Sequence, residues 1–405
     1  MSQLAGPTRL RYWLVLVGAG GYTCLMFIWF SLPAFLSPII AELNLTGTQA
    51  GLLVGAVPLM YIPLGIGTGI LVDRLGPGRS IAGGVFIYGF AQIGRSFAGE
   101  FYSILVMTLI IGVGATTITF GLPKLVSVLF EPQETGLPSS IYLISASAGS
   151  AAAFGIGRPI FGSWLGGWRP VFFWSGIVAI GYGLLWMTVS YRMRIDSRNA
   201  EQNESFRPAQ IFKDLRMILS HHELRYLVII GTMYLGISHG IQGWLPTMLE
   251  FRGFDPTSAG LTASLFVIAA ATGTFIVPTL ADRMGIRRTV LVICGITLSL
   301  GILGIMGGGT TSLTFIGVSI AGFGIGGISP MVRALPPEFD GIGARLTGTA
   351  IGFIFAVGEI GGFLGPVVIG TLHETTNSFV PGLLLLTLGG LVVAAAGQRL
   401  RQLEQ

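Results

Sequence analysis

The sequence predicts an all-α membrane protein with twelve transmembrane helices in two related sets of six. Three observations support this fold class. Of the 405 residues, 52% are hydrophobic and only 10% are charged, which is too little polar surface for a soluble globule of this length. Twelve apolar segments are each long enough to cross a bilayer, and a charged hinge occurs twice at equivalent places in the chain.

Twelve segments have the length of a membrane span, for which roughly 20 apolar residues are needed. They lie at 12–38, 49–71, 80–98, 102–128, 137–164 and 170–191 and, after one long polar interval, at 224–249, 257–281, 289–307, 311–333, 345–371 and 379–397. We predict an N-terminal six-helix bundle over 1–191, a hydrophilic cytoplasmic linker over 192–223 and a C-terminal six-helix bundle over 224–405. The first apolar segment is too long for a signal-peptide core, so we predict a retained span.

A short charged hinge joins the second and third predicted spans of each half. Residues 69–76 read G-I-L-V-D-R-L-G, and residues 278–285 read P-T-L-A-D-R-M-G. Their aspartates, Asp73 and Asp282, lie 209 positions apart. A repeat of this length indicates two related halves rather than a solenoid.

The positions of the basic residues predict the orientation in the membrane, because positively charged loops stay cytoplasmic. With the N-terminus inside, 19 of the 23 Lys and Arg residues fall on the cytoplasmic side, and Arg95, Arg158, Arg169 and Arg252 remain outside or within the membrane. We therefore predict that both termini and both hinges are cytoplasmic. We expect the membrane to be a prokaryotic inner (plasma) membrane. No basic stripe interleaved with aromatic residues accompanies the net charge of +5, which argues against nucleic-acid binding.

The sequence shows no pattern typical of an enzyme or of a metal site. Cys24 and Cys294 lie in apolar segments, where thiols act as small hydrophobic groups, so we expect neither a disulfide nor a metal. The glycine-rich run 322–327 fits G-x-G-x-x-G but lies inside the tenth span without a βαβ unit, so we interpret it as a helix-packing surface. We expect no cofactor, and we expect an ion or substrate gradient to supply the energy.

Twelve spans, a six-plus-six division and a G-x-x-x-D-R-x-G hinge resemble the major facilitator superfamily, whose members are mostly secondary transporters. The resemblance covers almost the whole chain and implies two six-helix bundles that rock around a central cavity by alternating access. The segments 122–126, 166–169 and 358–362 are similar to the nitrate, nitrite and cyanate-type anion carriers. This similarity implies a small anion as substrate.

Three positions depart from the family pattern. Pro278 stands in the second hinge where the first has Gly69, and Arg158 takes the place of a glycine before Pro159 in span five. In span four, Thr108 stands where the family commonly has an arginine. A charge relay that depends on that arginine therefore has no counterpart at this position.

Three ionisable residues inside predicted spans are the main candidates for chemistry, since such residues cost roughly 2.5–3.5 kcal/mol on insertion scales and usually face a cavity or a partner. We predict that Glu359 accepts a proton, that Arg158 holds a carboxylate or oxyanion, and that His239 titrates. Structural alternatives remain open. Glu359 would be a neutral acid in a helix interface, Arg158 a snorkelling residue or an ion-pair partner of an acid such as Glu359, and His239 a residue bonded to a neighbouring helix.

Further residues complete the predicted substrate and gating sets. Tyr234 and Gln242 share a glycine-rich segment of span seven with His239, and Trp29 is expected either to line the cavity or to pack. The predicted gating residues belong to the two hinges: Asp73, Arg74, Arg79, Asp282 and Arg283. Lys124 and Arg333, near the cytoplasmic ends of spans four and ten, are interpreted as snorkelling side chains that could also attract an anion.

These observations favour a monomeric secondary transporter that moves a small organic or inorganic anion, coupled to protons. Two alternatives stay open. A multidrug or metabolite exporter of the same fold would use Trp29 and Phe30 for apolar cargo and Glu359 to recognise a cation. A non-transporting membrane receptor or scaffold would not need buried ionisable residues or paired hinges.

Overall fold

The computed structural model describes residues 8–196, 217, 221–307, 311–339 and 342–400. Every regular element in this part of the chain is a helix, and eleven helices are long and apolar enough to cross a membrane. The remaining predicted span is α4 (Pro77–Ser96), whose 20 residues extend about 30 Å. It carries Arg79, Gln92 and Arg95 and is the least apolar of the long helices. The all-α membrane architecture is thus confirmed, while positions 197–216 and 218–220 of the predicted linker lie outside the described residues.

Contacts divide the chain into two units. The first comprises Met1–Asn44 and Leu59–Phe206, and the second comprises Leu45–Pro58 and Arg207–Gln405. Helix α3 (Gly47–Leu75) therefore contributes its first turns to the second unit and the remainder to the first. The predicted bundle boundaries at 191 and 224 stay a prediction.

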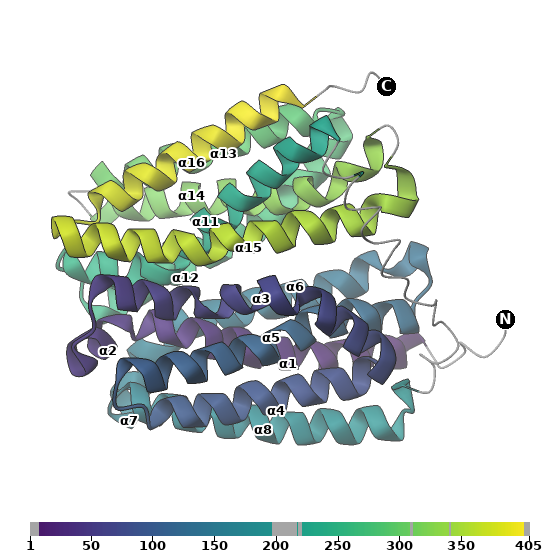
Figure 1. Ribbon diagram of the computed structural model, residues 1–405, viewed down its shortest axis with the longest axis horizontal. Helices are drawn as coiled ribbons and strands as arrows, with labels where there is room; N and C mark the ends of the chain where they lie inside the picture. The colour runs from purple at the N-terminus through teal and green to yellow at the C-terminus, as the bar shows by residue number, and fades with distance from the viewer. Residues whose placement is uncertain (1–7, 197–216, 218–220, 308–310, 340–341, 401–405) are drawn as a thin grey trace. The chain divides into compact units, whose positions relative to one another are not determined.

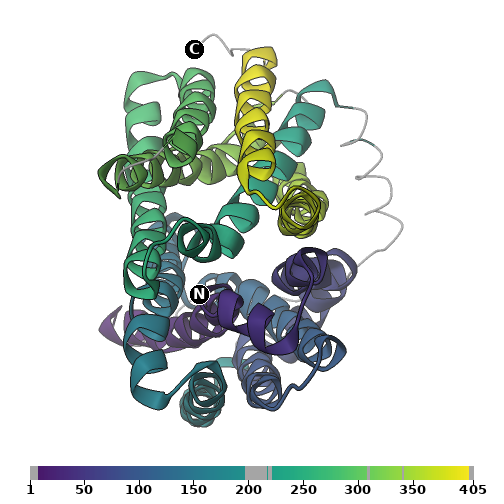
Figure 2. The same ribbon diagram turned by 90° about the vertical axis from the view of Figure 1, so that its left-hand side faces the viewer.

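The first unit is built on long helices that pack side by side (Figures 1 and 2). Helix α4 packs against both α5 (Phe101–Leu129) and α8 (Trp168–Arg192), and α1 (Thr8–Ala34) packs against α6 (Gly136–Ala152). Helix α6 continues directly into a wider π-helical stretch, η2 (Ala153–Gly162), and the short α7 (Ser163–Leu165) follows. A 3₁₀ turn, η1 (Pro132–Glu134), connects α5 to α6.

The first predicted span, 12–38, proves to be two helices. Helix α1 ends at Ala34, and the short α2 (Leu36–Leu43) begins after Phe35, whose φ and ψ angles of −106° and 15° are not helical. Pro38 has no N–H to donate to the carbonyl four residues earlier. The helical hydrogen-bond ladder is therefore interrupted at Ala34.

The second unit contains α11 (His222–Phe251), α12 (Pro256–Met284), α13 (Arg287–Gly307), α14 (Thr311–Ala334), α15 (Gly343–Thr376) and α16 (Val380–Arg399), with a 3₁₀ turn, η4 (Pro336–Glu338), after α14. Helix α11 packs against α15 and α16, and α14 packs against α12 and α13. The glycine-rich run of α14 explains the second contact. A Cβ atom added at Gly322 would lie 2.5 Å from Phe266 O of α12, and one at Gly324 would lie 2.7 Å from Leu298 N of α13. The prediction that this run is a packing surface is confirmed.

Candidate functional site

Helices α11 and α15 approach each other closely because glycines line their shared face. A Cβ atom added at Gly361 would overlap the carbonyl oxygen of Thr232, and one added at Gly365 would overlap that of Gly236. Small residues that let helix backbones touch are the usual means of helix association in a membrane. This close packing sets the positions of the polar side chains on the two helices.

His239 of α11 and Glu359 of α15 meet at this interface. The distance between His239 Nε2 and Glu359 Oε2 is 3.6 Å, and each side chain is 13% exposed. Oε2 has no hydrogen-bond donor among the described residues. The structure thus brings together two of the three ionisable residues singled out from the sequence, in a place where a proton on either one changes the charge felt by the other.

Gly362 leaves the space that this pair occupies. A Cβ atom at position 362 would lie 2.5 Å from Glu359 Oε2 and 2.9 Å from His239 Cδ2. Either distance is too short for a non-bonded contact, so a larger residue would displace one of the two side chains. The sequence places Gly362 in a Gly-Gly pair, but its neighbours become evident only in the folded chain.

The other predicted residues of α11 lie on either side of His239. Gln242 Nε2 donates to Ser238 Oγ over 2.9 Å, so the amide is held along its own helix. Tyr234 lies about one and a half turns before His239 and is half-buried. The assignment of Tyr234 and Gln242 to a substrate site stays a prediction.

Arg158 lies inside the π-helical stretch η2 of the first unit. Its Nη1 donates to Ala34 O over 3.3 Å, which is the carbonyl that Pro38 leaves without its helical N–H. Its side chain is half-buried. Since π-helical turns are rare and occur frequently at functional sites, the local backbone marks Arg158 as unusual independently of its charge.

Trp29 belongs to an aromatic group in the first unit. Its ring stacks on that of Phe30 with centroids 5.7 Å apart, and the ring of Tyr61 lies 6.2 Å away. Tyr61 shares a hydrogen bond of 2.8 Å with Thr119. Trp29 is only 7% exposed, so its packing is established, while a role in lining a cavity stays a prediction.

The two hinge aspartates bind different cations. Asp73 Oδ1 forms an ion pair of 2.9 Å with Lys124 Nζ of α5, so Lys124 is a hinge partner as well as a residue near a helix end. Asp282 Oδ1 instead binds Arg287 Nε of its own hinge at 2.7 Å, and Arg287 also contacts Glu338.

Other basic residues at or near the hinges behave differently. Arg74 and Arg283 are exposed. Arg333 stands at the same 209-residue offset from Lys124 as Asp282 does from Asp73. It hydrogen-bonds to Ser329 and stacks over Phe355, 4.1 Å from the ring centre. The duplicated hinges therefore form different contacts in the two units.

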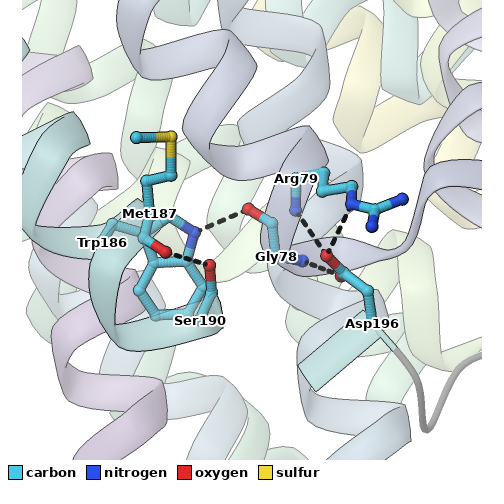
Figure 3. A network of polar contacts seen from close by, with 6 residues as sticks. All are labelled: Gly78, Arg79, Trp186, Met187, Ser190 and Asp196. Carbon is cyan, nitrogen blue, oxygen red and sulfur yellow. Dashed lines mark hydrogen bonds and ion pairs between the residues drawn. The ribbon is translucent and has the colours of Figure 1, made fainter. Parts of the chain in front are cut away.

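Arg79, the remaining predicted gating residue, takes part in a network at the start of α4 (Figure 3). Asp196, just beyond the end of α8, accepts hydrogen bonds from the backbone N–H groups of Gly78 (2.7 Å) and Arg79 (3.1 Å), and Arg79 Nε lies 3.7 Å from its Oδ2. Trp186 Nε1 donates to Gly78 O over 2.9 Å. The carboxylate caps N–H groups that a helix start leaves unpaired.

Sequence reasoning missed the role of Asp196. The signal available was an acidic residue directly after the sixth span, but nothing in the sequence links it to a hinge 117 positions away. Partial burial raises the pKa of Asp196 above its usual value, although the hydrogen bonds from Gly78 and Arg79 act in the opposite direction.

Comparison with known proteins agrees with this architecture. The sequence model of the Major Facilitator Superfamily matches residues 18–366. The chain resembles a bacterial homolog of the human lysosomal transporter Spinster, solved in an inward-facing, unoccupied conformation, with a TM-score of 0.76, 17% identity and 98% of both chains covered. That similarity concerns the fold.

Three curated relatives come from bacteria. The uncharacterized transporter YycB of Bacillus subtilis strain 168 is 27% identical over 96% of this chain and 93% of its own length. The 3-(3-hydroxy-phenyl)propionate transporter of Escherichia coli strain K12 is 27% identical over 85% of this chain and 83% of its own length. The nitrite extrusion protein of Bacillus subtilis is 22% identical over 89% and 87%. The chain therefore belongs to the Major Facilitator Superfamily and is an integral membrane transporter, not an enzyme.

Proposed function

We propose that this protein moves a small anion together with a proton, with Arg158 binding the anion and Glu359 carrying the proton. The observation that carries the proposal is the His239–Glu359 pair, with 3.6 Å between Nε2 and Oε2. The carboxyl of Glu359 is enclosed between two helices, and the imidazole of His239 lies beside it. This pair can take up or release a proton while both side chains stay in place.

Charge balance explains why proton and anion would move together. The empty carrier holds the cation of Arg158 and the anion of Glu359. The fully loaded carrier holds the same cation, a bound anion and a neutral, protonated Glu359. Both states have no net charge on these groups, whereas either half-loaded state leaves one charge uncompensated, which is costly in a low-dielectric interior. Reorientation is thus favoured only when both species are bound or both are absent.

The relatives support an anionic substrate. The names of two of them contain an aryl propionate and nitrite, both of which are anions near neutral pH. The arginine fork suits the planar carboxylate or the inorganic oxyanion equally well. We propose a small carboxylate or inorganic oxyanion as the substrate class, and a monomer in the inner membrane of a bacterium with both termini in the cytoplasm.

The hinge residues would control access in this proposal. The pairs Asp73–Lys124 and Asp282–Arg287 hold the ends of spans in place, and their rupture would accompany reorientation. Asp73→Asn is expected to change the balance between the inward-open and outward-open states of the transporter. The measurement is the labelling of a single introduced cysteine, placed at the cytoplasmic end of a span in one variant and at the opposite end in another. An unchanged balance would count against a gating role.

Uptake into liposomes tests the proposed function. Purified protein would be reconstituted with an inward proton gradient and offered 3-(3-hydroxyphenyl)propionate, nitrate and nitrite. One pH unit corresponds to about 1.4 kcal/mol, so coupling of one proton to one monovalent anion should give roughly tenfold accumulation per unit. Accumulation that a protonophore does not abolish would contradict proton coupling. Transport of a lipophilic cation in place of every anion would favour the multidrug exporter.

A further inference from the structure

Arg95 is a charged side chain with no exposed surface, in the last turn of α4. Its Nη2 donates to Ile28 O over 3.1 Å, and its guanidinium lies 4.8 Å from the ring centre of Phe172. Nε and Nη1 are buried and have no hydrogen-bond partner in the described part of the chain. Among the same residues, no carboxylate lies within ion-pair distance of Arg95.

The polar neighbours of Arg95 are neutral. Gln92, one turn earlier, donates from Nε2 to Ser31 Oγ (3.3 Å) and to Ser175 Oγ (3.1 Å). The two serine hydroxyls in turn donate to the carbonyls of Ile28 and Phe172 over 2.7 and 3.0 Å. We call Ser31, Gln92, Arg95 and Ser175 the Arg95 cluster. It joins α1, α4 and α8 within the first unit and contains one cation and no anion. Gln92 Oε1 is also buried without a hydrogen-bond partner in the described part of the chain, but it is neutral and cannot balance the charge of Arg95.

Arg169, another arginine of the first unit, differs from Arg95 in having a carboxylate partner in the part of the chain that the structure describes. Its Nε binds Glu42 Oε1 at 2.9 Å, and its Nη1 donates to Ser96 O over 2.9 Å, so a carboxylate balances the charge. Arg95 has carbonyl and aromatic contacts but, within the described residues, no such carboxylate. A guanidinium stays charged under ordinary conditions, and a buried charge without a counter-charge is among the costliest arrangements in a protein.

We propose that the Arg95 cluster binds a small monovalent inorganic anion of the chloride type, separate from the transported substrate. The anion accepts from the N–H groups on Nε and Nη1 and neutralises the guanidinium. The Gln92 Nε2 group already donates to two serines, so the arginine supplies the donors and the charge. The bound ion stabilises the contact of α4 with α1 and α8, because it removes the cost of the buried cation that these helices enclose.

Thermal unfolding in matched salts tests this site. Sodium gluconate would be replaced stepwise by sodium chloride at constant ionic strength, since gluconate is too large for an enclosed site. The wild type should show a saturable upward shift of the unfolding midpoint. Arg95→Met should show no shift, whereas Arg169→Met, the matched control, should keep the shift even if its midpoint is lower throughout. A wild type that is insensitive to chloride would overturn the proposal.

Two further measurements separate this site from others. Arg158→Met should retain the chloride shift. Loss of the shift in that variant, with retention in Arg95→Met, would place the ion at the substrate site and refute the proposal. If Arg95→Met does not fold, diffraction from wild-type crystals soaked in bromide decides. An anomalous peak within hydrogen-bond reach of Arg95 Nε or Nη1 is expected, and its absence would overturn the assignment.

Discussion

His239 and Glu359 face each other from α11 and α15, with 3.6 Å between Nε2 and Oε2 and both side chains largely buried. The two residues are 120 positions apart in the sequence. The pair exists because glycines let the two helix backbones approach and because Gly362 leaves room beside it. The first two predictions concern this arrangement.

Replacing the carboxyl tests the proton step. Glu359→Gln keeps the size of the side chain but cannot release a proton, so the variant should lose accumulation driven by a pH gradient while still exchanging internal for external substrate. The measurement is paired uptake and counterflow in liposomes. Accumulation at the wild-type level would exclude Glu359 as the proton carrier.

Gly362→Ala tests whether the pair depends on the space beside it. The added methyl group would displace Glu359 or His239, and such overpacking typically costs about 1–3 kcal/mol of unfolding free energy. We expect lower thermal stability and weaker proton coupling. Gly352→Ala is the matched control on the same helix, because a Cβ atom there meets nothing within 4 Å. Equal behaviour of the two variants would show that the space at 362 is unimportant.

Arg158→Ala tests the anion contact. A hydrogen bond to a charged group contributes roughly 1.5–3 kcal/mol, so substrate affinity should fall by about 10- to 100-fold. Arg158→Lys keeps the charge but loses the planar fork, so its substrate affinity should lie between those of Arg158→Ala and the wild type. Binding measured by calorimetry checks this, with Arg169→Ala as the control. Wild-type affinity in Arg158→Ala would remove the residue from the site.

Asp196→Asn tests the cap on α4 through its pH dependence. Because partial burial raises the pKa of Asp196, the folded state binds the proton more tightly than the unfolded state does. The stability from this group is fully present below the unfolded pKa and is lost as pH rises through the folded pKa. The wild type should therefore gain stability relative to Asp196→Asn when unfolding midpoints are compared at decreasing pH. A difference that shrinks on acidification would show the opposite shift.

The sequence predicted the helical fold more completely than it predicted contacts. The membrane requires about 20 apolar residues per span, so hydropathy located the helices, and even α4 was found despite Arg79 and Arg95. The break after Ala34 was missed because Pro38 acts on a carbonyl four residues away within an otherwise apolar run. Likewise, repetition identified Asp73 and Asp282 as equivalent, but their partners, Lys124 and Arg287, are not equivalent.

The amino-acid sequence by itself determined that this chain is an all-helical membrane transporter with duplicated hinges and a few ionisable residues in its spans. These features can be read from the sequence because the constraints that the membrane sets are local: a lipid interior penalises an unpaired charge wherever it occurs along a span. Only the tertiary structure decided that Glu359 meets His239, that Asp196 caps α4, and that no carboxylate of the described residues pairs with the enclosed Arg95. Such contacts depend on the rotation and register of helices, which are set by small-residue packing between segments far apart in the chain.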